Sequence, residues 1–174
     1  MNAVPQRTAL ANAIASWDGK TTSDLEQTGS RFARQRDYME ELAAMAADPE
    51  LQRGSTWLVL NALKTGSVLD AQRENALLDA LPLLDDWQSR LHLLQCLQYL
   101  EIPERRSREV EGFVRRCLAA SNKFVRAWAY SGFHELALRF PSYKEEAAQI
   151  ITMALKDEAP SVKARIRQLK LQDQ

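Results

Sequence analysis

Glycine and proline are scarce in this sequence, and each occurs only six times in 174 residues. Folds built from strands and tight turns use both residues often, because turns need a positive φ angle or a fixed φ angle. Leucine, alanine, glutamate, glutamine and arginine dominate instead, and all five have high helix propensity. Hydrophobic residues make up 45% of the chain, enough to bury a substantial core. The composition therefore predicts an all-α fold and excludes a largely disordered chain.

Long apolar runs are missing too, and the chain has only two cysteines, Cys96 and Cys117. No stretch reaches the roughly 20 apolar residues that a membrane-spanning helix needs. The segment from Met1 to Arg7 does not combine a basic leader with an apolar stretch, so we expect no secretory signal. A low cysteine content is typical of proteins in a reducing compartment. We expect a cytoplasmic protein with no membrane partner.

Motifs that carry catalysis or hold cofactors are also absent. The chain has no glycine-rich phosphate loop, no His-Glu-x-x-His pair and no Ser, His and Asp in a catalytic order. His92 and Cys96 are four residues apart on one predicted helix, but no third or fourth metal ligand lies near them in the sequence. His134 and Glu135 could form an acid–base pair, yet an exposed histidine is the interpretation that their mostly polar surroundings favour. We expect no enzyme activity, no cofactor and no metal.

Neither sign of charge is in excess, because 23 Lys and Arg residues balance 23 Asp and Glu residues. The distribution is uneven: residues 1–102 hold nine basic and fourteen acidic residues, whereas residues 103–174 hold fourteen and nine. Obligate nucleic-acid binders usually have a pI above about 9. The charge thus favours another protein or an acidic peptide as the partner over a nucleic acid, and it leaves the oligomeric state open.

Turn and capping residues divide the chain into about nine predicted helices. Ser23 and Glu26 have the spacing of a capping box, which predicts a long helix that Gly29 could interrupt. Gly66 is expected to end one helix, and Pro82 to bend or end another. The predicted helices cover about 5–17 (opened by Pro5), 24–47, 49–64, 67–84, 86–101, 104–120, 122–140 and 141–156, and the last begins at Pro160.

A period of about 37 residues runs through these helices. When the repeats are aligned on this period, equivalent positions form columns. One column contains small residues, one contains cations, and several contain apolar residues. The small column is Ala43, Ala80, Cys117 and Ala154; the basic column is Arg53, Arg90, Arg126 and Lys163; the apolar or small columns begin at Thr56, Val59, Leu60 and Leu63. Helical pairs with apolar stripes cannot bury them singly and must stack. The period predicts a short right-handed α-solenoid of about four helical pairs.

The residues that open the alternate, inner helices show a family resemblance. Asp48, Asp85 and Asn122 stand at these helix starts, and the pairs Val125-Arg126 and Val162-Lys163 follow in the last two units. Over about residues 30–171 this pattern resembles HEAT and armadillo-like repeats, although the first two units lack the Val-Arg pair. The resemblance implies an N-terminal capping helix and connector over 1–22 and a repeat domain over 23–174, with approximate repeats 23–66, 67–102, 103–140 and 141–174.

The basic column has two interpretations. In the HEAT-like repeats that this chain resembles, such a cation commonly pairs with the Asp that opens a neighbouring inner helix. A guanidinium bonded both to a carboxylate and to helix-end carbonyls would hold successive units in register. Alternatively, the column lines a partner-binding groove on the inner-helix, concave face. The candidate residues of that groove are Arg53, Arg90, His92, Arg126, Trp128, His134, Lys163 and Arg165. Of Trp57, Trp87 and Trp128, we expect Trp128 to be the one that is partly exposed and available to a partner, because its column is otherwise polar.

These patterns favour a non-enzymatic scaffold or adaptor that binds a partner on its inner-helix face. A nucleic-acid-binding or DNA-repair protein is the alternative, because one family of helical-repeat alkylpurine DNA glycosylases shares the general architecture and uses Trp, Asp and Arg on its concave face. An accessory subunit of an enzyme, as with the HEAT-like lyase repeats, is a third hypothesis. The basic run Arg105, Arg106 and Arg108 lies at a helix start, where it is either a solvated turn or a contact for an anion or a partner.

Overall fold

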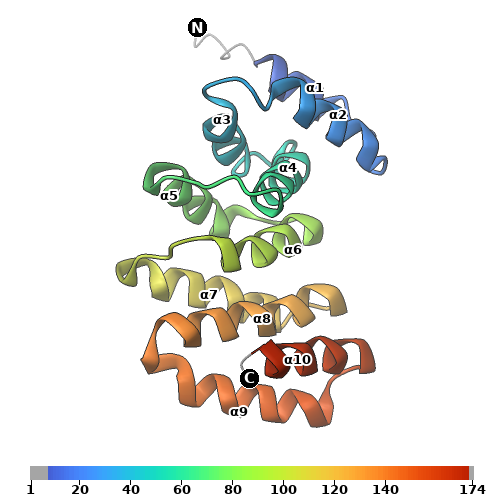
Figure 1. Ribbon diagram of the computed structural model, residues 1–174. Coiled ribbons are helices and arrows are strands. Elements are labelled where there is room, and N and C mark those ends of the chain that lie inside the picture. The colour runs from blue at the N-terminus through green and yellow to red at the C-terminus, as the bar shows by residue number, and fades with distance from the viewer. Residues whose placement is uncertain (1–7, 173–174) are drawn as a thin grey trace, which may run out of the picture. The chain divides into compact units, whose positions relative to one another are not determined.

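The structure is a computed structural model that describes residues 8–172, with side chains over residues 8–169 (Figure 1). Across this part of the chain it contains ten α-helices, four short 3₁₀ helices and no strand, so the all-α prediction is confirmed. The chain divides into two compact units, Met1–Ser89 and Arg90–Gln174, with the boundary inside α6 (Trp87–Cys96). None of the helices within 8–172 combines the length and the hydropathy that a bilayer span requires.

The first unit consists of short helices joined by tight connectors. Within it, α3 packs against both α4 and α5, while α1 and α2 pack against each other and against α4. Its elements are α1 (Ala9–Ala15), α2 (Thr22–Phe32), α3 (Tyr38–Met45), α4 (Gln52–Lys64), α5 (Ala71–Ala80) and the 3₁₀ helix η1 (Leu81–Leu83). Pro5, which was expected to open the first helix, lies outside the described residues, and α1 is instead capped by the hydroxyl of Thr8.

The second unit contains longer helices, with α8 at its centre. α8 packs against α7, α9 and α10, and α10 also packs against α9 (Figure 1). Its elements after α6 are η2 (Leu97–Tyr99), η3 (Glu104–Arg106), α7 (Ser107–Leu118), α8 (Lys123–Arg139), η4 (Pro141–Tyr143), α9 (Lys144–Asp157) and α10 (Pro160–Gln172). The core between the last three helices includes Tyr130, Ile151 and Ile166.

Several predicted helix ends are confirmed. α4 ends at Lys64, and Gly66 follows it with φ +98°, where the amide of Ser67 donates to the carbonyl of Ala62 at 3.0 Å. That pattern is a Schellman motif, which needs a residue in the left-handed region. Pro82 stands in η1 directly after α5, as its missing amide requires. The side chain of Asn122 caps α8 by accepting from two backbone amides.

The single helix predicted over 24–47 is wrong, and this accounts for the tenth helix. α2 ends at Phe32 and α3 begins at Tyr38. The two rings are buried, at 3% and 6% exposure, although they are six residues apart and would point in different directions on one continuous helix. The chain instead makes two short turns between them, which let both rings enter the core. Gly29 does not interrupt α2 but packs inside it, where a Cβ would lie 3.2 Å from Leu58.

The predicted capping box is also wrong. Ser23 lies inside α2, whose N-cap residue is Thr21 and has no side-chain capping bond. The turn before the helix is organised by Asp18, whose carboxylate accepts from the amides of Lys20 and Thr21 and from the hydroxyl of Thr21. These hydrogen bonds to the charged carboxylate lower the pKa of Asp18. The carboxylate of Asp18 therefore orders the connector before α2, and no side chain caps the first turn of this helix.

The 37-residue columns are buried within their units. All four members of the small column are at most 4% exposed: Ala43, Ala80, Cys117 and Ala154. The position just before each cation of the basic column is at 0% exposure in every case: Gln52, Ser89, Val125 and Val162. The next apolar column, Thr56, Leu93, Ala129 and Ile166, is also at 0%. In these three columns, equivalent positions of successive repeats thus have the same burial, whether their residues are polar or apolar.

Candidate partner-binding surface

Arg126 is held entirely by groups of the second unit. Its Nε and Nη2 donate to the two carboxylate oxygens of Glu158 at 2.9 and 3.1 Å, and its Nη1 donates to the carbonyls of Ala120 and Ser121, both at 2.9 Å. The side chains of Arg126 and Glu158 are 22% and 13% exposed. The guanidinium thereby ties α8 to the connector before α10, as the structural interpretation predicted, although the carboxylate is Glu158 and not one of the Asp residues.

The electrostatics of this pair follow from its hydrogen bonds. The Arg126 guanidinium lowers the pKa of Glu158, and the Glu158 carboxylate raises the pKa of Arg126. The hydroxyl of Tyr130 also donates to Glu158, at 3.1 Å. Burial and the nearby carboxylate raise the pKa of Tyr130 to about 12, so it stays protonated as a donor at neutral pH. Arg126 is accordingly part of the structural framework and is not free to bind a partner.

Other cations of the basic column bond to backbone carbonyls. In the first unit, Arg53 donates to the carbonyl of Gly19 and lies 5.2 Å from the centre of the Trp17 ring system. In the second unit, Lys163 donates to the carbonyl of Lys156, at the end of α9, at 2.7 Å. Arg90 is half-buried in α6. Arg53, Arg126 and Lys163 therefore hold connectors and helix ends in place, and these three cations do not form the free row that the groove hypothesis needed.

His92 is not available to a partner, which corrects its place among the predicted site residues. It is 9% exposed, and Ser55, the equivalent residue of the first unit, is at 0%. Trp128 and Arg165 occupy the same column and are half-buried. The difference follows from side-chain length, because the longer side chains reach the surface from a position where shorter ones do not. Cys96 and Cys117 are buried and form no disulfide, and the described residues contain no group of three or more potential metal ligands.

Trp128 and Arg165 form the clearest exposed pair of the predicted site. The guanidinium carbon of Arg165, on α10, lies 3.8 Å from the centre of the Trp128 ring system on α8. Trp128 is half-buried and thus partly exposed, as expected, but it does not stand out: Trp57 is half-buried too, and Trp87 is exposed, at 42%. Trp87 is the first residue of α6, so its side chain extends back beyond the helix start. Exposure alone therefore does not distinguish Trp128; its contact with a cation does.

Arg165 has no carboxylate bonded to it among the described residues. Its Nε donates to the hydroxyl of Ser131 at 3.0 Å, and its Nη1 donates to the side-chain oxygen of Gln168 at 3.3 Å. Burial lowers the pKa of Arg165, and the charge of Glu135 only partly opposes this effect. A guanidinium has five N–H groups. This cation, partly removed from water, therefore keeps donors for an incoming acceptor.

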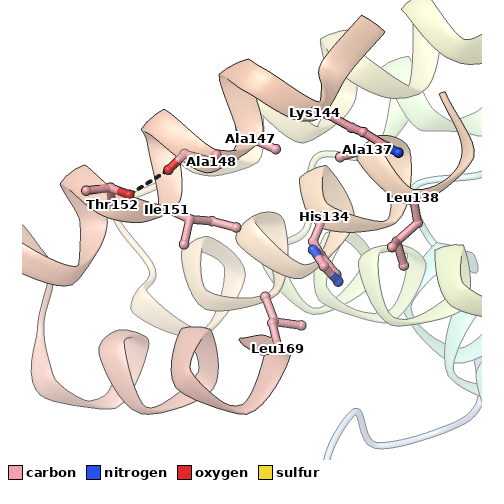
Figure 2. A pocket seen from close by; sticks show the side chains of 9 residues that line it. All are labelled: His134, Ala137, Leu138, Lys144, Ala147, Ala148, Ile151, Thr152 and Leu169. Atoms are coloured by element: carbon pink, nitrogen blue, oxygen red, sulfur yellow. Dashed lines mark hydrogen bonds between the residues drawn. The ribbon is translucent and has the colours of Figure 1, made fainter. Parts of the chain in front are cut away.

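His134 lines a pocket of about 340 Å³ between α8, α9 and α10 (Figure 2). The pocket exists because alanines face one another across it: Ala137 on α8 and Ala147 and Ala148 on α9 are too small to fill the space. Ile151 and Leu169 supply further apolar walls. The complete lining is His134, Ala137, Leu138, Lys144, Ala147, Ala148, Ile151, Thr152 and Leu169. A mostly apolar hollow of this size suits a large apolar side chain or a small ligand.

Polar groups of the pocket lie among these apolar walls. Thr152 donates its hydroxyl to the carbonyl of Ala148 at 2.7 Å, so its polar group is already used. The imidazole of His134 lies between Leu138 and Leu169, and Lys144 extends from α9 toward α8 (Figure 2). Leu138 is 57% exposed, a large value for a leucine. The pocket thus combines an exposed apolar residue with a cationic one.

Leu138, Lys144 and Glu158 were missed at the sequence level. Glu158 had a usable signal, because it stands five residues before Lys163, as Asp48 stands five before Arg53 and Asp85 five before Arg90. Leu138 and Lys144 had none, because their proximity depends on how α8 and α9 pack. Comparisons of the chain with protein-family models, with curated proteins and with solved structures give no match.

Proposed function

We propose that the protein is a non-enzymatic interaction module, a scaffold or adaptor that binds an acidic segment of another protein. Its fold in this proposal is a short right-handed α-solenoid of HEAT-like helical pairs, with α4, α6, α8 and α10 as the inner helices. The equal burial of equivalent positions in the small column and in the column that begins at Thr56 supports this fold. So do side-chain bonds across about one repeat inside each unit, such as Gln52 to the amide of Asp85 and Arg165 to Ser131.

The observation that carries the proposal is the state of Arg165. The side chain is held over the Trp128 ring system by Ser131 and Gln168, which fixes its rotamer before any partner arrives. A cation that is already ordered and partly desolvated loses little entropy on binding a carboxylate. Stacked arginine and tryptophan side chains are among the residues that contribute most to protein interfaces. A partner carboxylate could form an ion pair with Arg165, which no carboxylate of the described residues forms.

The pocket supplies a second contact for the same partner. Leu169 of the pocket lies four residues after Arg165 on α10, so the two residues share one face of that helix, about 6 Å apart along its axis. A peptide that places a carboxylate on Arg165 could therefore put an apolar side chain into the pocket beside Leu138. Lys144 at the pocket favours a second acidic residue next to that apolar one. The expected partner segment combines acidic residues with one large apolar residue.

A protein partner is favoured over a nucleic acid by the bonding of the basic column. Binding a nucleic-acid backbone requires several cations that neutralise successive phosphates. Arg126 is paired with Glu158, and Arg53 and Lys163 donate to backbone carbonyls. These cations are thus engaged within the protein. No observation specifically favours an accessory subunit of an enzyme.

Site-specific photo-crosslinking in the native cell tests the proposal. A photoreactive phenylalanine analogue replaces Leu138 in one variant and Met153 in a control, because these side chains are similarly exposed, at 57% and 63%, on different parts of the second unit. We expect the Leu138 position to capture a protein that the Met153 position does not capture. Mass spectrometry of the crosslinked peptide should place the contact next to acidic residues.

A charge reversal on α10 provides the second arm of this test. Arg165→Glu should abolish the crosslink from position 138, whereas Arg167→Glu, an equal change at an exposed position of the same helix, should leave it intact. Circular dichroism of both variants establishes that they are folded. Equal capture from positions 138 and 153, or a crosslink that survives Arg165→Glu in a folded protein, would refute the proposed surface.

A further inference from the structure

The second unit has another cavity, away from the pocket of Figure 2, at the basic run that the sequence placed at a helix start. The cavity has a volume of about 540 Å³ and lies between η3, the first turns of α7, and η4. It is lined by Glu104, Arg105, Ser107, Arg108, Glu111, Ser142 and Tyr143. Six of these seven side chains are charged or carry a hydroxyl close to the backbone, and the seventh, Tyr143, carries a phenol. The cavity is therefore suited to a polar ligand.

Two of the three arginines of the basic run are unpaired. Arg106 forms a two-point ion pair with Glu109, with distances of 2.6 and 2.9 Å. Arg105 and Arg108 are exposed, line the cavity, and form no hydrogen bond or ion pair with any other described residue. Guanidinium groups suit phosphate oxygens because their N–H groups form a planar fork. The chain thus uses one arginine internally and presents two to the cavity.

Ser107 is the second, independent indication of a ligand. It is only 8% exposed, it lines the cavity, and its hydroxyl has no hydrogen-bond partner among the described residues. Its oxygen is not one of the fully buried unpaired polar atoms of the described residues, so the hydroxyl opens into the cavity with its hydrogen-bonding capacity unused. Ser107 and the two unpaired arginines line the same cavity, so its hydroxyl and their guanidinium groups can serve the same ligand. An acceptor bound in the cavity would satisfy this hydroxyl.

The carboxylates of the cavity do not favour a cation there. Glu111 uses one oxygen to accept from Nε of Arg115 at 2.8 Å and the other to accept from the hydroxyl of Tyr143 at 3.1 Å. Its charge and both of its oxygens are therefore already engaged. Glu104 alone opposes the unpaired charges of Arg105 and Arg108.

We infer that this cavity binds a phosphate monoester through Arg105, Ser107 and Arg108. The cavity is larger than one phosphate group needs, so it also has room for the group that carries the phosphate. The phosphate can belong to a phosphorylated side chain of a protein or to a small phosphorylated compound. This site is separate from the surface of Trp128 and Arg165, and it does not depend on that surface being a partner-binding site.

Nuclear magnetic resonance titration of the full chain with inorganic phosphate tests the inference. Sodium chloride is adjusted so that the ionic strength stays constant during the titration, because non-specific electrostatic attraction of anions weakens as the salt concentration rises. We expect saturable shifts of the backbone amides of residues 104–108 and 142–143. A short phosphoserine peptide and free O-phosphoserine are titrated in parallel, and the tighter ligand identifies the source as a phosphoprotein or a small compound. Shifts that are absent, or that chloride reproduces at the same ionic strength, would overturn the site.

Matched variants separate this site from general charge attraction. Replacing Arg105 and Arg108 by alanine should weaken phosphate binding by about tenfold or more, since each loses a charged hydrogen bond. Ser107→Ala should weaken binding by a smaller factor without changing the net charge. Arg116→Ala, at an exposed position near the other end of α7, should leave binding unchanged. Equal weakening by Arg116→Ala, or full binding by the folded double variant, would show an adventitious ion only.

Discussion

Glu158→Gln should destabilise the second unit, whereas Glu146→Gln should do so only weakly. Both glutamates accept hydrogen bonds from an arginine about one repeat earlier in the chain, Arg126 for Glu158 and Arg115 for Glu146. The two ion pairs differ in exposure: the Arg126 and Glu158 side chains are 22% and 13% exposed, and the Arg115 and Glu146 side chains are 41% and 44% exposed. The comparison isolates the effect of burial on similar chemistry.

The expected magnitudes follow from this difference in exposure. A solvent-exposed ion pair contributes about 0–1 kcal/mol, which is the range we expect for Glu146→Gln. Removing one partner of a fully buried pair costs about 3–5 kcal/mol, and a hydrogen bond to a charged group is worth about 1.5–3 kcal/mol. The Arg126 pair is mostly but not fully buried, and glutamine keeps one acceptor oxygen for it. We therefore expect Glu158→Gln to cost about 2 kcal/mol.

Urea unfolding followed by circular dichroism at neutral pH measures both free energies. The pKa of Glu158 is lowered in the folded protein, so its contribution is complete above the ordinary carboxyl pKa. As the pH falls through the folded pKa, the carboxylate of the wild type is protonated and this contribution is lost. The difference between wild type and Glu158→Gln should therefore shrink in acid. Equal costs for the two variants, or a difference that does not change with pH, would refute this account of Arg126.

Two further predictions concern the backbone and the core. Gly66→Ala should destabilise the protein by about 1 kcal/mol, because φ is +98° at Gly66 and an added Cβ would gain no contact in return. Gly112→Ala, inside α7, should stabilise the protein by a similar amount, because the added Cβ would be in ordinary contact at 3.8 Å. Thermal unfolding of both variants measures these effects, and two shifts of the same sign would contradict the reasoning. Cys117 should not react with a thiol reagent in the native protein, because it is 1% exposed and burial raises its pKa to about 11. Rapid labelling of one native thiol at pH 8, identified as Cys117 by peptide mapping, would contradict the prediction.

Several features that depend on local chemistry could be predicted from the sequence, although the capping box at Ser23 could not. Gly66, Pro82 and Asn122 act at helix ends as their residue types require, because capping and proline effects involve only a few neighbouring residues. The 37-residue columns were also visible, since a repeated burial pattern leaves a repeated pattern of side-chain size. The break between α2 and α3 was not visible, because it depends on the burial of Phe32 and Tyr38 together.

The candidate surface was predictable only in part, for a related reason. The sequence located the basic column, but which cations are used internally depends on where carboxylates and carbonyls lie in space. Arg126 meets Glu158, while Arg165 meets Trp128 and no carboxylate. The pocket at His134 results from alanines on two different helices, and no local pattern predicts that they face one another.

A double-mutant cycle between Arg165 and the partner tests the central claim most directly. The captured segment is made as a synthetic peptide, once with its acidic residues and once with the corresponding amides, and each is titrated calorimetrically into wild type and Arg165→Glu. We expect the amide peptide to bind wild type about tenfold or more weakly, and the two peptides to differ little or in the opposite sense with Arg165→Glu. An equal preference for the acidic peptide in both proteins would contradict the claim that Arg165 recognises the partner carboxylate.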